Sequence, residues 1–298
     1  MFFKAKPFVK WAGGKSFLLS QIDSWLPHSF LDAEDITYVE PFVGGGAMLF
    51  FLLQRYPAIH KVVINDINED LIECYHLIKK DPKQLIMLLE RIEKDYNCLN
   101  DEGKKEYYYY IRNRYNDKKE RAHLRAAYFF FLNRTCFNGL YRVNGNSQFN
   151  VPFGKAFSPV ICNKDLIMAD HNVFNSVDMT ILCGSYKKVI NYVEDFTKTF
   201  FYIDPPYLPI SVTSYFKQYS NSPFGVEEQV ELKLFCDTLS EKGSRIMLSN
   251  SDCKREDGSS YFESLYPEYD CHRVRAKRII SAHGDRNAYT SEVLIKNY

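Results

Sequence analysis

The chain has 298 residues, of which 46% are hydrophobic and 25% charged, and its formal net charge is +1. This composition is ordinary for a soluble globular protein with one large or two modest domains, and the net charge by itself does not indicate nucleic-acid binding. No apolar segment has the length of a secretion signal or a membrane span. The eight cysteines include no C-x-x-C pair, which argues against a zinc site and a disulfide scaffold.

The first half of the chain alternates between strand and helix patterns and then becomes helical. We expect a helix over 17–26, a short strand over 38–40, a buried helix over 47–54, a strand over 61–65, a helix over 68–77 and mostly helical structure from 81 to about 134. Asn68 and Asp81 are typical helix-starting residues. Pro82 suits a first helical position because the N–H that proline lacks is not needed there.

The second half returns to strand patterns after a polar hairpin. The hairpin is expected over 141–153 around Asn144-Gly145, strands at 180–183, 199–203, 244–248, near 274 and at 292–295, and a helix over 226–239. Strands that alternate with helices imply an α/β fold with a mainly parallel sheet. We therefore predict a sheet domain formed by residues 1–70 and 175–298, with residues 71–174 as an inserted, mainly helical lobe.

The motif Asp204-Pro205-Pro206-Tyr207 follows an apolar strand pattern, Phe200–Ile203. It is therefore expected at the carboxyl end of a strand, where ligands of open α/β sheets bind. Two consecutive prolines fix the backbone and offer carbonyls without competing N–H groups. A carboxylate, a carbonyl and an aromatic ring suit a planar group with an amino substituent, such as a nucleobase. The open alternative is a strand-to-loop turn with a surface Asp and a packed Tyr.

A second candidate site follows the strand expected over 38–40. Gly44-Gly45-Gly46 stand between a strand and a helix, where a backbone without side chains can approach a ligand closely. Asp66, at the end of the next strand, is placed for the hydroxyls of a ribose. Leu49 replaces the last glycine of a G-x-G-x-x-G pattern, which favours a ligand with adenosine but no phosphate. A simple glycine turn is the open alternative.

Basic residues cluster in two parts of the sequence. Between Lys104 and Lys155 there are eleven Lys or Arg and three acidic residues, and a second cluster covers residues 272–278. Basic faces on a nearly neutral chain fit a surface that follows the phosphates of a nucleic acid. Solvated faces of helices and strands are the alternative.

Six sequence blocks follow one another between residue 7 and the end of the chain. They are Lys10-Trp11-Ala12-Gly13-Gly14-Lys15, Glu40-Pro41-Phe42-Val43-Gly44-Gly45-Gly46, Asp66-Ile67-Asn68, Asn138-Gly139-Leu140-Tyr141-Arg142, Phe149-Asn150-Val151-Pro152-Phe153-Gly154 and Asp204-Pro205-Pro206-Tyr207. Together they closely resemble the Dam-type (D12 class) DNA adenine-N6 methyltransferases. The resemblance implies S-adenosyl-L-methionine as cofactor, a Rossmann-like methyltransferase sheet and an inserted helical DNA-recognition lobe with a β-hairpin.

The resemblance also implies roles for individual residues. The catalytic residues would be Asp204, Pro205, Pro206 and Tyr207. The cofactor-binding residues would be Trp11, Lys15, Glu40, Pro41, Phe42, Gly44, Gly46, Asp66 and Asp204, and no metal is needed. The DNA-binding residues would be Lys10, Phe137, Asn138, Leu140, Arg142 and Pro152. Ser185 stands where many relatives carry an acid after the third strand, which leaves the contact to the cofactor's adenine open.

The expected reaction is methyl transfer to the N6 amino group of an adenine flipped out of duplex DNA. The Asp204 carboxylate and the Pro205 carbonyl would accept hydrogen bonds from the two N–H groups of this amino group, and Tyr207 would stack on the flipped base. Arg142 would pair with guanine, with a phosphate contact as the alternative. Phe137 would intercalate or fill the vacated space, unless it is buried in the lobe.

The resemblance further suggests GATC as the target, double-stranded DNA as the partner, no membrane contact, and a cytoplasmic protein of bacterial or phage origin. A cognate restriction endonuclease acting on the same site would be a separate protein. The open alternatives are a cytosine-N4 or RNA adenine methyltransferase and a DNA-binding relative without catalysis. A nicotinamide-dependent oxidoreductase is disfavoured by the imperfect glycine pattern.

Overall fold

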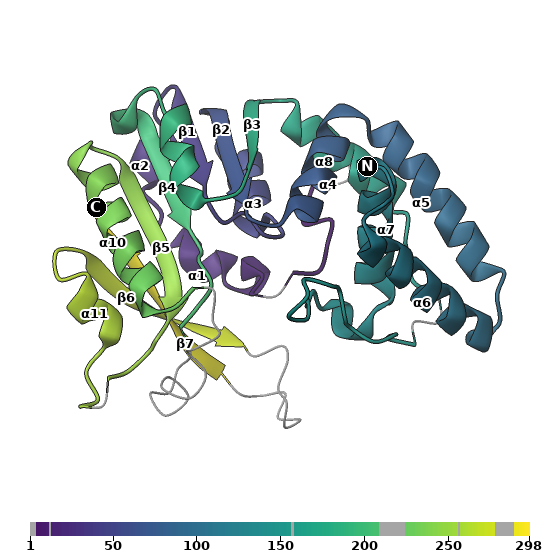
Figure 1. The fold of residues 1–298 in the computed structure, drawn as a ribbon. Coiled ribbons are helices and arrows are strands. Elements are labelled where there is room, and N and C mark those ends of the chain that lie inside the picture. The colour runs from purple at the N-terminus through teal and green to yellow at the C-terminus, as the bar shows by residue number, and fades with distance from the viewer. Residues whose placement is uncertain (1–3, 12, 156–157, 209–223, 256, 278–288) are drawn as a thin grey trace. The chain divides into compact units, whose positions relative to one another are not determined.

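The computed structural model describes residues 4–11, 13–155, 158–208, 224–255, 257–277 and 289–298. Its helices and strands are drawn in Figure 1. The strands are β1 Ile36–Glu40, β2 Ile59–Asp66, β3 Asp178–Cys183, β4 Thr199–Ile203, β5 Arg245–Ser251, β6 Asp270–Lys277 and β7 Tyr289–Lys296. The α-helices are α1 Leu19–Asp23, α2 His28–Leu31, α3 Ala47–Arg55, α4 Glu69–Lys80, α5 Pro82–Asn97, α6 Asp101–Asp117, α7 Ala122–Thr135, α8 Lys164–Phe174, α10 Val226–Glu241 and α11 Tyr261–Leu265.

The described strands form a sheet in the order β3-β2-β1-β4-β5-β7-β6. Strand β1 pairs in parallel with β2 and with β4, and β4 pairs in parallel with β5. Strand β7 runs antiparallel to both β5 and β6. The α/β fold of a Rossmann-like methyltransferase sheet is confirmed. The central strands β2, β1, β4 and β5 are parallel, as expected for a mainly parallel sheet, and the antiparallel direction of β7 is an addition that the apolar strand pattern could not reveal.

The strand order changes direction between β1 and β4, which lie next to each other. All residues of both strands are buried, as expected for central strands of a covered sheet. Glu40 ends β1 and Ile203 ends β4, so the motif that starts at Asp204 leaves the sheet where the order changes. Ligands of open α/β sheets bind at such points.

Local sequence signals account for several helix boundaries. The Asn68 side chain accepts a hydrogen bond from the Leu71 N–H at the start of α4, and Asp81 accepts one from the Gln84 N–H at the start of α5. Pro82 occupies the first position of α5, as expected. The helix expected over 17–26 is wrong in length, since residues 15–17 form a 3₁₀ turn and α1 is short. Helix α8 was not expected.

The chain divides into two compact units. One comprises Met1–Gly14, Gly44–Arg55 and Asn65–Ser185, and the other comprises Lys15–Val43, Tyr56–Ile64 and Tyr186–Tyr298. In the first unit, α7 is buried on most of its surface, which is typical of a central helix. The lobe expected over 71–174 lies inside this unit, and its boundaries stay a prediction. Within the part of the chain that the structure describes, no helix combines the length and hydropathy needed to span a bilayer.

Candidate functional site

The Asp204 carboxylate, directly after β4, is held by one partner on each oxygen. Lys15 Nζ lies 2.8 Å from Oδ2, and the Ser249 hydroxyl donates a 2.9 Å hydrogen bond to Oδ1. The Lys15 side chain is 5% exposed and that of Asp204 is 20% exposed. Since Ile203 is paired with Leu248 across β4 and β5, Ser249 lies next to Asp204 by strand register. The carboxylate therefore has a defined position and a compensated charge.

The Tyr207 ring lies beside the same lysine. Lys15 Nζ is 4.6 Å from the ring centroid, a cation–π distance, and the Tyr207 hydroxyl donates a 2.8 Å hydrogen bond to Glu292 Oε2. Burial raises the pKa of Glu292, with the Asp204 charge acting in the same direction, while Lys15 and the Tyr207 hydroxyl lower it. The Lys15 ammonium thus contacts both the Asp204 carboxylate and one face of the Tyr207 ring.

The backbone of residues 206–208 is fixed by buried polar side chains. Gln229 of α10 donates a 3.1 Å hydrogen bond to the Pro206 carbonyl, and the Asn250 amide donates to Gln229 Oε1. Asn250 also accepts from the Leu208 N–H, and the Ser251 hydroxyl donates to the Leu208 carbonyl. Gln229 and Asn250 are fully buried. The motif is therefore a rigid platform.

These supporting residues were missed in the sequence. The polar run Ser249-Asn250-Ser251 interrupts an apolar strand and is a signal that could have found three of them, because buried polar groups in a strand need partners. Gln229 and Glu292 carry no comparable local signal.

The Asp66 carboxylate, at the end of β2, is bound by backbone N–H groups. Gly44 donates to Oδ2 at 3.0 Å and Asn68 donates to Oδ1 at 2.9 Å. Burial raises the pKa of Asp66, and these backbone hydrogen bonds oppose the rise. The side chain is half-buried. The two oxygens of a carboxylate offer about four lone-pair sites. The two hydrogen bonds from N–H groups therefore leave lone pairs of Asp66 that can accept further hydrogen bonds.

The glycine loop is packed by aromatic side chains. Gly44 has a φ of +49°, and a Cβ placed on it would lie 2.7 Å from Trp11 Cδ1. Gly46 has a φ of +75°, and its Cβ would lie 2.6 Å from the Tyr75 hydroxyl oxygen. Trp11 in turn stacks on Tyr141 with ring centroids 5.4 Å apart. The glycines are therefore needed both for the turn and for contact with these rings.

The last residue of β1 and the two residues that follow it form the remaining part of the expected cofactor set. Glu40 is 3% exposed and accepts a 2.7 Å hydrogen bond from the Tyr38 hydroxyl. Pro41 is buried, and Phe42 is half-buried. The Phe42 ring stacks on Tyr186 with centroids 5.1 Å apart.

The predicted site residues are distributed over both units. Lys15, Glu40, Pro41, Phe42 and Asp204–Tyr207 belong to one unit, whereas Trp11, Gly44, Gly46 and Asp66 belong to the other. Lys15 contacts Asp204 in the same unit, and Asp66 contacts Gly44 in the other unit. Lys15 was expected as a cofactor contact, and the contact of its ammonium to Asp204 was not expected.

The segment after α7 is joined to Lys10 by the buried side chain of Asn133. The Asn133 amide accepts from the Lys10 N–H at 2.8 Å and donates to the carbonyls of Lys10 and Gly139. Phe137 is 52% exposed, so the alternative that it is buried in the lobe is wrong. Asn138 is exposed and adopts a φ of +55°. The exposed Phe137 ring therefore belongs to the short segment whose Gly139 is tied to Lys10 through Asn133.

The expected hairpin is present as a tight turn with isolated bridges. Val143 bridges to Phe149, and the Asn144 N–H donates to the Gln148 carbonyl at 2.9 Å. Arg142 is exposed, and its Nε donates a 2.7 Å hydrogen bond to Asn150 Oδ1.

The two other predicted DNA-binding residues flank this turn. Leu140 is half-buried, whereas Pro152 is exposed. The Pro152 carbonyl accepts from the Phe137 N–H at 2.9 Å. The two arms of the turn are thus tied together at their base.

Helix α6 supports the returning arm of the hairpin. The Tyr108 hydroxyl and the Arg112 guanidinium donate to the Val151 carbonyl. The Asn116 amide exchanges two hydrogen bonds with the backbone of Phe149, at 2.8 and 3.0 Å. Because these three helix residues are spaced by four, they share one face of α6. The hairpin is therefore attached to a rigid helix.

Several basic residues are engaged by acidic side chains or carbonyls of the protein itself. Arg114 pairs with Glu120, Arg125 pairs with Asp70, and Arg134 donates to the Phe8 carbonyl. These three guanidinium groups thus support the fold, which limits the basic surface expected from the sequence.

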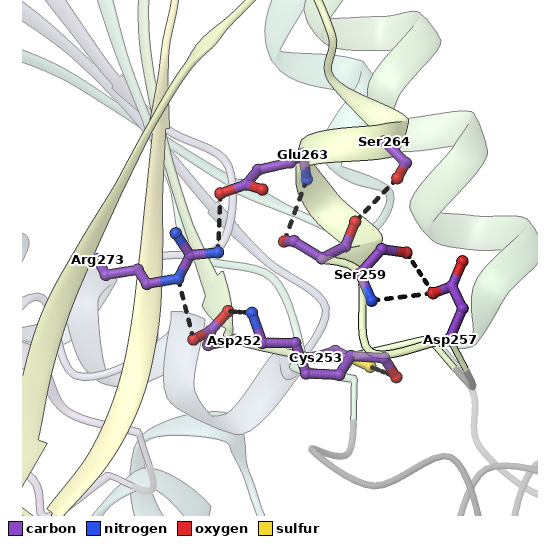
Figure 2. Close-up of polar contacts among 9 residues, drawn as sticks. Asp252, Cys253, Asp257, Ser259, Glu263, Ser264 and Arg273 are labelled. Carbon is purple, nitrogen blue, oxygen red and sulfur yellow. Dashed lines mark hydrogen bonds and ion pairs between the residues drawn. The ribbon is translucent and has the colours of Figure 1, made fainter.

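The second basic cluster is also partly neutralised. Figure 2 shows Arg273 bound by two carboxylates, with Nε 3.2 Å from Asp252 Oδ2 and an Nη atom 2.7 Å from Glu263 Oε1. Arg275 is exposed. Arg278 and the Lys277 side chain lie outside the described residues. The two carboxylates neutralise Arg273, which weighs against the expected phosphate contact at this residue but does not correspond to the alternative of a solvated strand face either.

Comparisons with known proteins agree on one family. Residues 11–280 match the family model described as D12 class N6 adenine-specific DNA methyltransferase. The chain is 41% identical to the Type II methyltransferase M.MjaIII of Methanocaldococcus jannaschii over 99% of this chain and 100% of that protein. It is 37% identical to the Type II methyltransferase M1.LlaDCHI of Lactococcus lactis, covering 98% and 95%. It is 31% identical to the DNA adenine methylase of Escherichia coli K12, again covering 98% and 95%.

Proposed function

The chain belongs to the D12 class N6 adenine-specific DNA methyltransferases, and we propose that it transfers the methyl group of S-adenosylmethionine to N6 of an adenine flipped out of duplex GATC. Family membership decides for adenine over cytosine and for DNA over RNA. The observation that carries the proposal is the Asp204 carboxylate, held between Lys15 and Ser249 at the carboxyl end of a central strand.

The Asp66 environment fits the ribose of this cofactor. The carboxylate is oriented by the N–H groups of Gly44 and Asn68 and retains lone pairs for ribose hydroxyls. When bound, S-adenosylmethionine supplies an electrophilic methyl group on a sulfonium. Trp11, packed on Gly44, and Phe42, packed on Tyr186, are the proposed aromatic contacts.

Asp204 activates the target amino group. The N6 lone pair of adenine is delocalised into the ring, so the nitrogen is a weak nucleophile. If Asp204 and the Pro205 carbonyl accept hydrogen bonds from its two N–H groups, the nitrogen becomes pyramidal, and its lone pair is withdrawn from the ring and directed toward the methyl group. Acceptors positioned before the reaction stabilise the transition state without reorganisation, and they align the reactants.

Tyr207 provides the stacking surface for the flipped adenine. Base–aromatic stacking contributes about 1–3 kcal/mol and offsets part of the cost of extruding the base. Lys15 lies over the ring and Glu292 accepts from its hydroxyl, so the ring has a defined plane.

The exposed residues near Lys10 and on the hairpin are proposed to bind DNA. Arg142 is proposed to read guanine through its Nη groups while its Nε is held by Asn150. Phe137 is proposed to occupy the space left by the flipped base, with Lys10, Asn138, Leu140 and Pro152 as neighbouring contacts. Since two relatives are named Type II methyltransferases, a separate restriction endonuclease with the same target is the proposed partner.

The test is nucleoside mass spectrometry of unmethylated duplex DNA after incubation with the protein and isotopically methyl-labelled S-adenosylmethionine. Label in N6-methyladenine within GATC is the expected result. Label in N6-methyladenine at another sequence would overturn only the proposed recognition sequence GATC. Label in N4-methylcytosine, or no label despite measured cofactor binding, would overturn the proposed reaction.

A further inference from the structure

Glu292 is one of the residues in contact with the motif that carry no local signal in the sequence. It lies on β7, where it is paired with Ser251 of β5 in antiparallel register. Residues two apart on a strand share a face of the sheet, so Ser249 and Ser251 point to the same side. Ser249 holds Asp204 on that side, and Glu292 holds the Tyr207 hydroxyl at 2.8 Å. Two neighbouring strands therefore bind the first and last residues of the motif.

Glu292 brings a second carboxylate close to Lys15. Two carboxylates, Asp204 and Glu292, stand beside the single ammonium of Lys15, which is almost fully buried. A partly buried carboxylate costs free energy unless it is hydrogen-bonded or paired. Glu292 meets this requirement through the Tyr207 hydroxyl and the nearby Lys15 charge. A neutral side chain would avoid the cost, so the carboxylate is better explained by a role in the reaction.

We propose that Glu292 is a positioning residue for methyl transfer, which holds the Tyr207 hydroxyl and thereby fixes the plane on which the target adenine stacks. The inference rests on the proposed function, because it requires the adenine to stack on Tyr207. A tyrosine ring turns about two torsions, and a hydrogen bond at its far end holds the phenolic oxygen and thereby the first torsion. Because the phenolic O–H bond prefers to lie in the ring plane, the direction to the acceptor also restricts the second torsion, which sets that plane. A charged acceptor makes this bond stronger than a neutral one. Restricting the ring restricts the base, which aligns the amino nitrogen for transfer.

The test is a double-mutant cycle measured by single-turnover methyl transfer at saturating cofactor and DNA. Glu292→Ala is expected to lower the single-turnover rate roughly tenfold, the scale of losing a hydrogen bond to a charged group. Glu292→Gln keeps an acceptor oxygen and is expected to lower it about threefold or less. In a Tyr207→Phe background, Glu292→Ala is expected to change the rate less than about twofold, because the contact is already absent.

Glu292→Leu gives a second variant that fills the space without an acceptor, in case Glu292→Ala does not fold. Glu194→Gln is the matched control, since Glu194 is a largely exposed carboxylate paired with Lys61. The fluorescence of 2-aminopurine at the target position distinguishes a positioning role from a merely structural one, because it reports the stacking of the flipped base. Weaker stacking on Tyr207 is expected to raise this fluorescence in Glu292→Ala, while the Kd for S-adenosylmethionine stays unchanged.

An equal loss of rate in the wild-type and Tyr207→Phe backgrounds would overturn the inference, as would a wild-type rate in both Glu292→Ala and Glu292→Leu. Failure of the proposed function looks different. In that case the wild-type protein itself transfers no label to adenine, whatever the variants do.

Discussion

Lys15 Nζ lies 2.8 Å from Asp204 Oδ2, which joins the turn before α1 to the carboxyl end of β4. The same ammonium lies over the Tyr207 ring. Lys15 therefore connects the group that is proposed to accept the amino hydrogens with the surface that is proposed to hold the base. An ion pair of this kind orients Asp204 before the substrate arrives, which is the condition for electrostatic stabilisation of a transition state.

Asp204→Ala is expected to lower turnover by at least about 100-fold, the scale of losing one preorganised hydrogen-bonding partner of a transition state. The variant also leaves Lys15 without its carboxylate, so folding is checked by thermal unfolding. Turnover is measured with labelled S-adenosylmethionine on duplex DNA. Ser249→Ala, which removes one hydrogen bond to the carboxylate, is expected to have a smaller effect. Near-normal turnover of Asp204→Ala would contradict the role assigned to Asp204.

Asp66→Asn is expected to raise the Kd for S-adenosylmethionine by roughly tenfold or more, because an amide NH₂ would replace one of the two acceptor oxygens and meet a backbone N–H group. Calorimetric titration of the cofactor measures this. Asp81→Asn is the control, since Asp81 is an exposed helix cap and Asn caps equally well. An unchanged Kd would remove Asp66 from the cofactor site.

Gly44→Ala is expected to lower the free energy of unfolding by about 1–3 kcal/mol, because a side chain at a φ of +49° is strained and its Cβ would meet Trp11. Urea unfolding followed by tryptophan fluorescence measures the change. Gly145→Ala is the control, since nothing lies within 4 Å of its Cβ position. Equal stability of the two variants would show that the loop adapts to a side chain.

Arg142→Ala is expected to relax discrimination at one base pair of the target, with a loss of about 1–3 kcal/mol for the preferred base. Methylation rates on a set of duplexes, each with one base pair of the target replaced, measure the discrimination. Asn150→Ala removes the hydrogen bond that orients Arg142 and is expected to produce a weaker form of the same change. Uniformly weaker methylation of all duplexes would instead identify a phosphate contact.

Asp170→Asn is expected to flatten the pH dependence of stability. Asp170 is fully buried on α8 and accepts a 3.1 Å hydrogen bond from the Lys6 N–H, and burial raises its pKa to about 8. Since the folded-state pKa lies above the unfolded value, the contribution to stability is complete below the unfolded pKa and is lost as pH rises toward 8. The wild-type protein should lose roughly 2–4 kcal/mol between pH 5 and pH 8 from this group.

Urea unfolding at several pH values measures this dependence. Asp165→Asn, which changes an exposed carboxylate on the same helix, should leave the dependence intact. If the free energy of unfolding of Asp170→Asn depends on pH as steeply as that of the wild-type protein, another group causes the pH dependence.

Short-range patterns in the sequence were sufficient for most elements of the fold. The caps at Asn68 and Asp81 are local contacts between neighbouring residues, and the structure confirms them. The buried strand before Asp204 is equally local, because a short apolar run rich in aromatic residues and bounded by two prolines favours a buried strand. The link between Asp66 and the glycine loop follows from strand order and spacing, and Asp66 does accept from the Gly44 N–H.

Only the tertiary structure decided which charges act together. Lys15, in the turn before α1, meets Asp204 after β4, and Glu292 of β7 meets Tyr207, although both pairs are distant in sequence. The sequence likewise could not tell that Arg125 is paired with Asp70 rather than available to phosphates. Such pairs depend on side chains that several strands or helices bring within a few ångströms of one another. The sequence by itself therefore determined the family and the motif, whereas the partners that orient the motif were decided by packing.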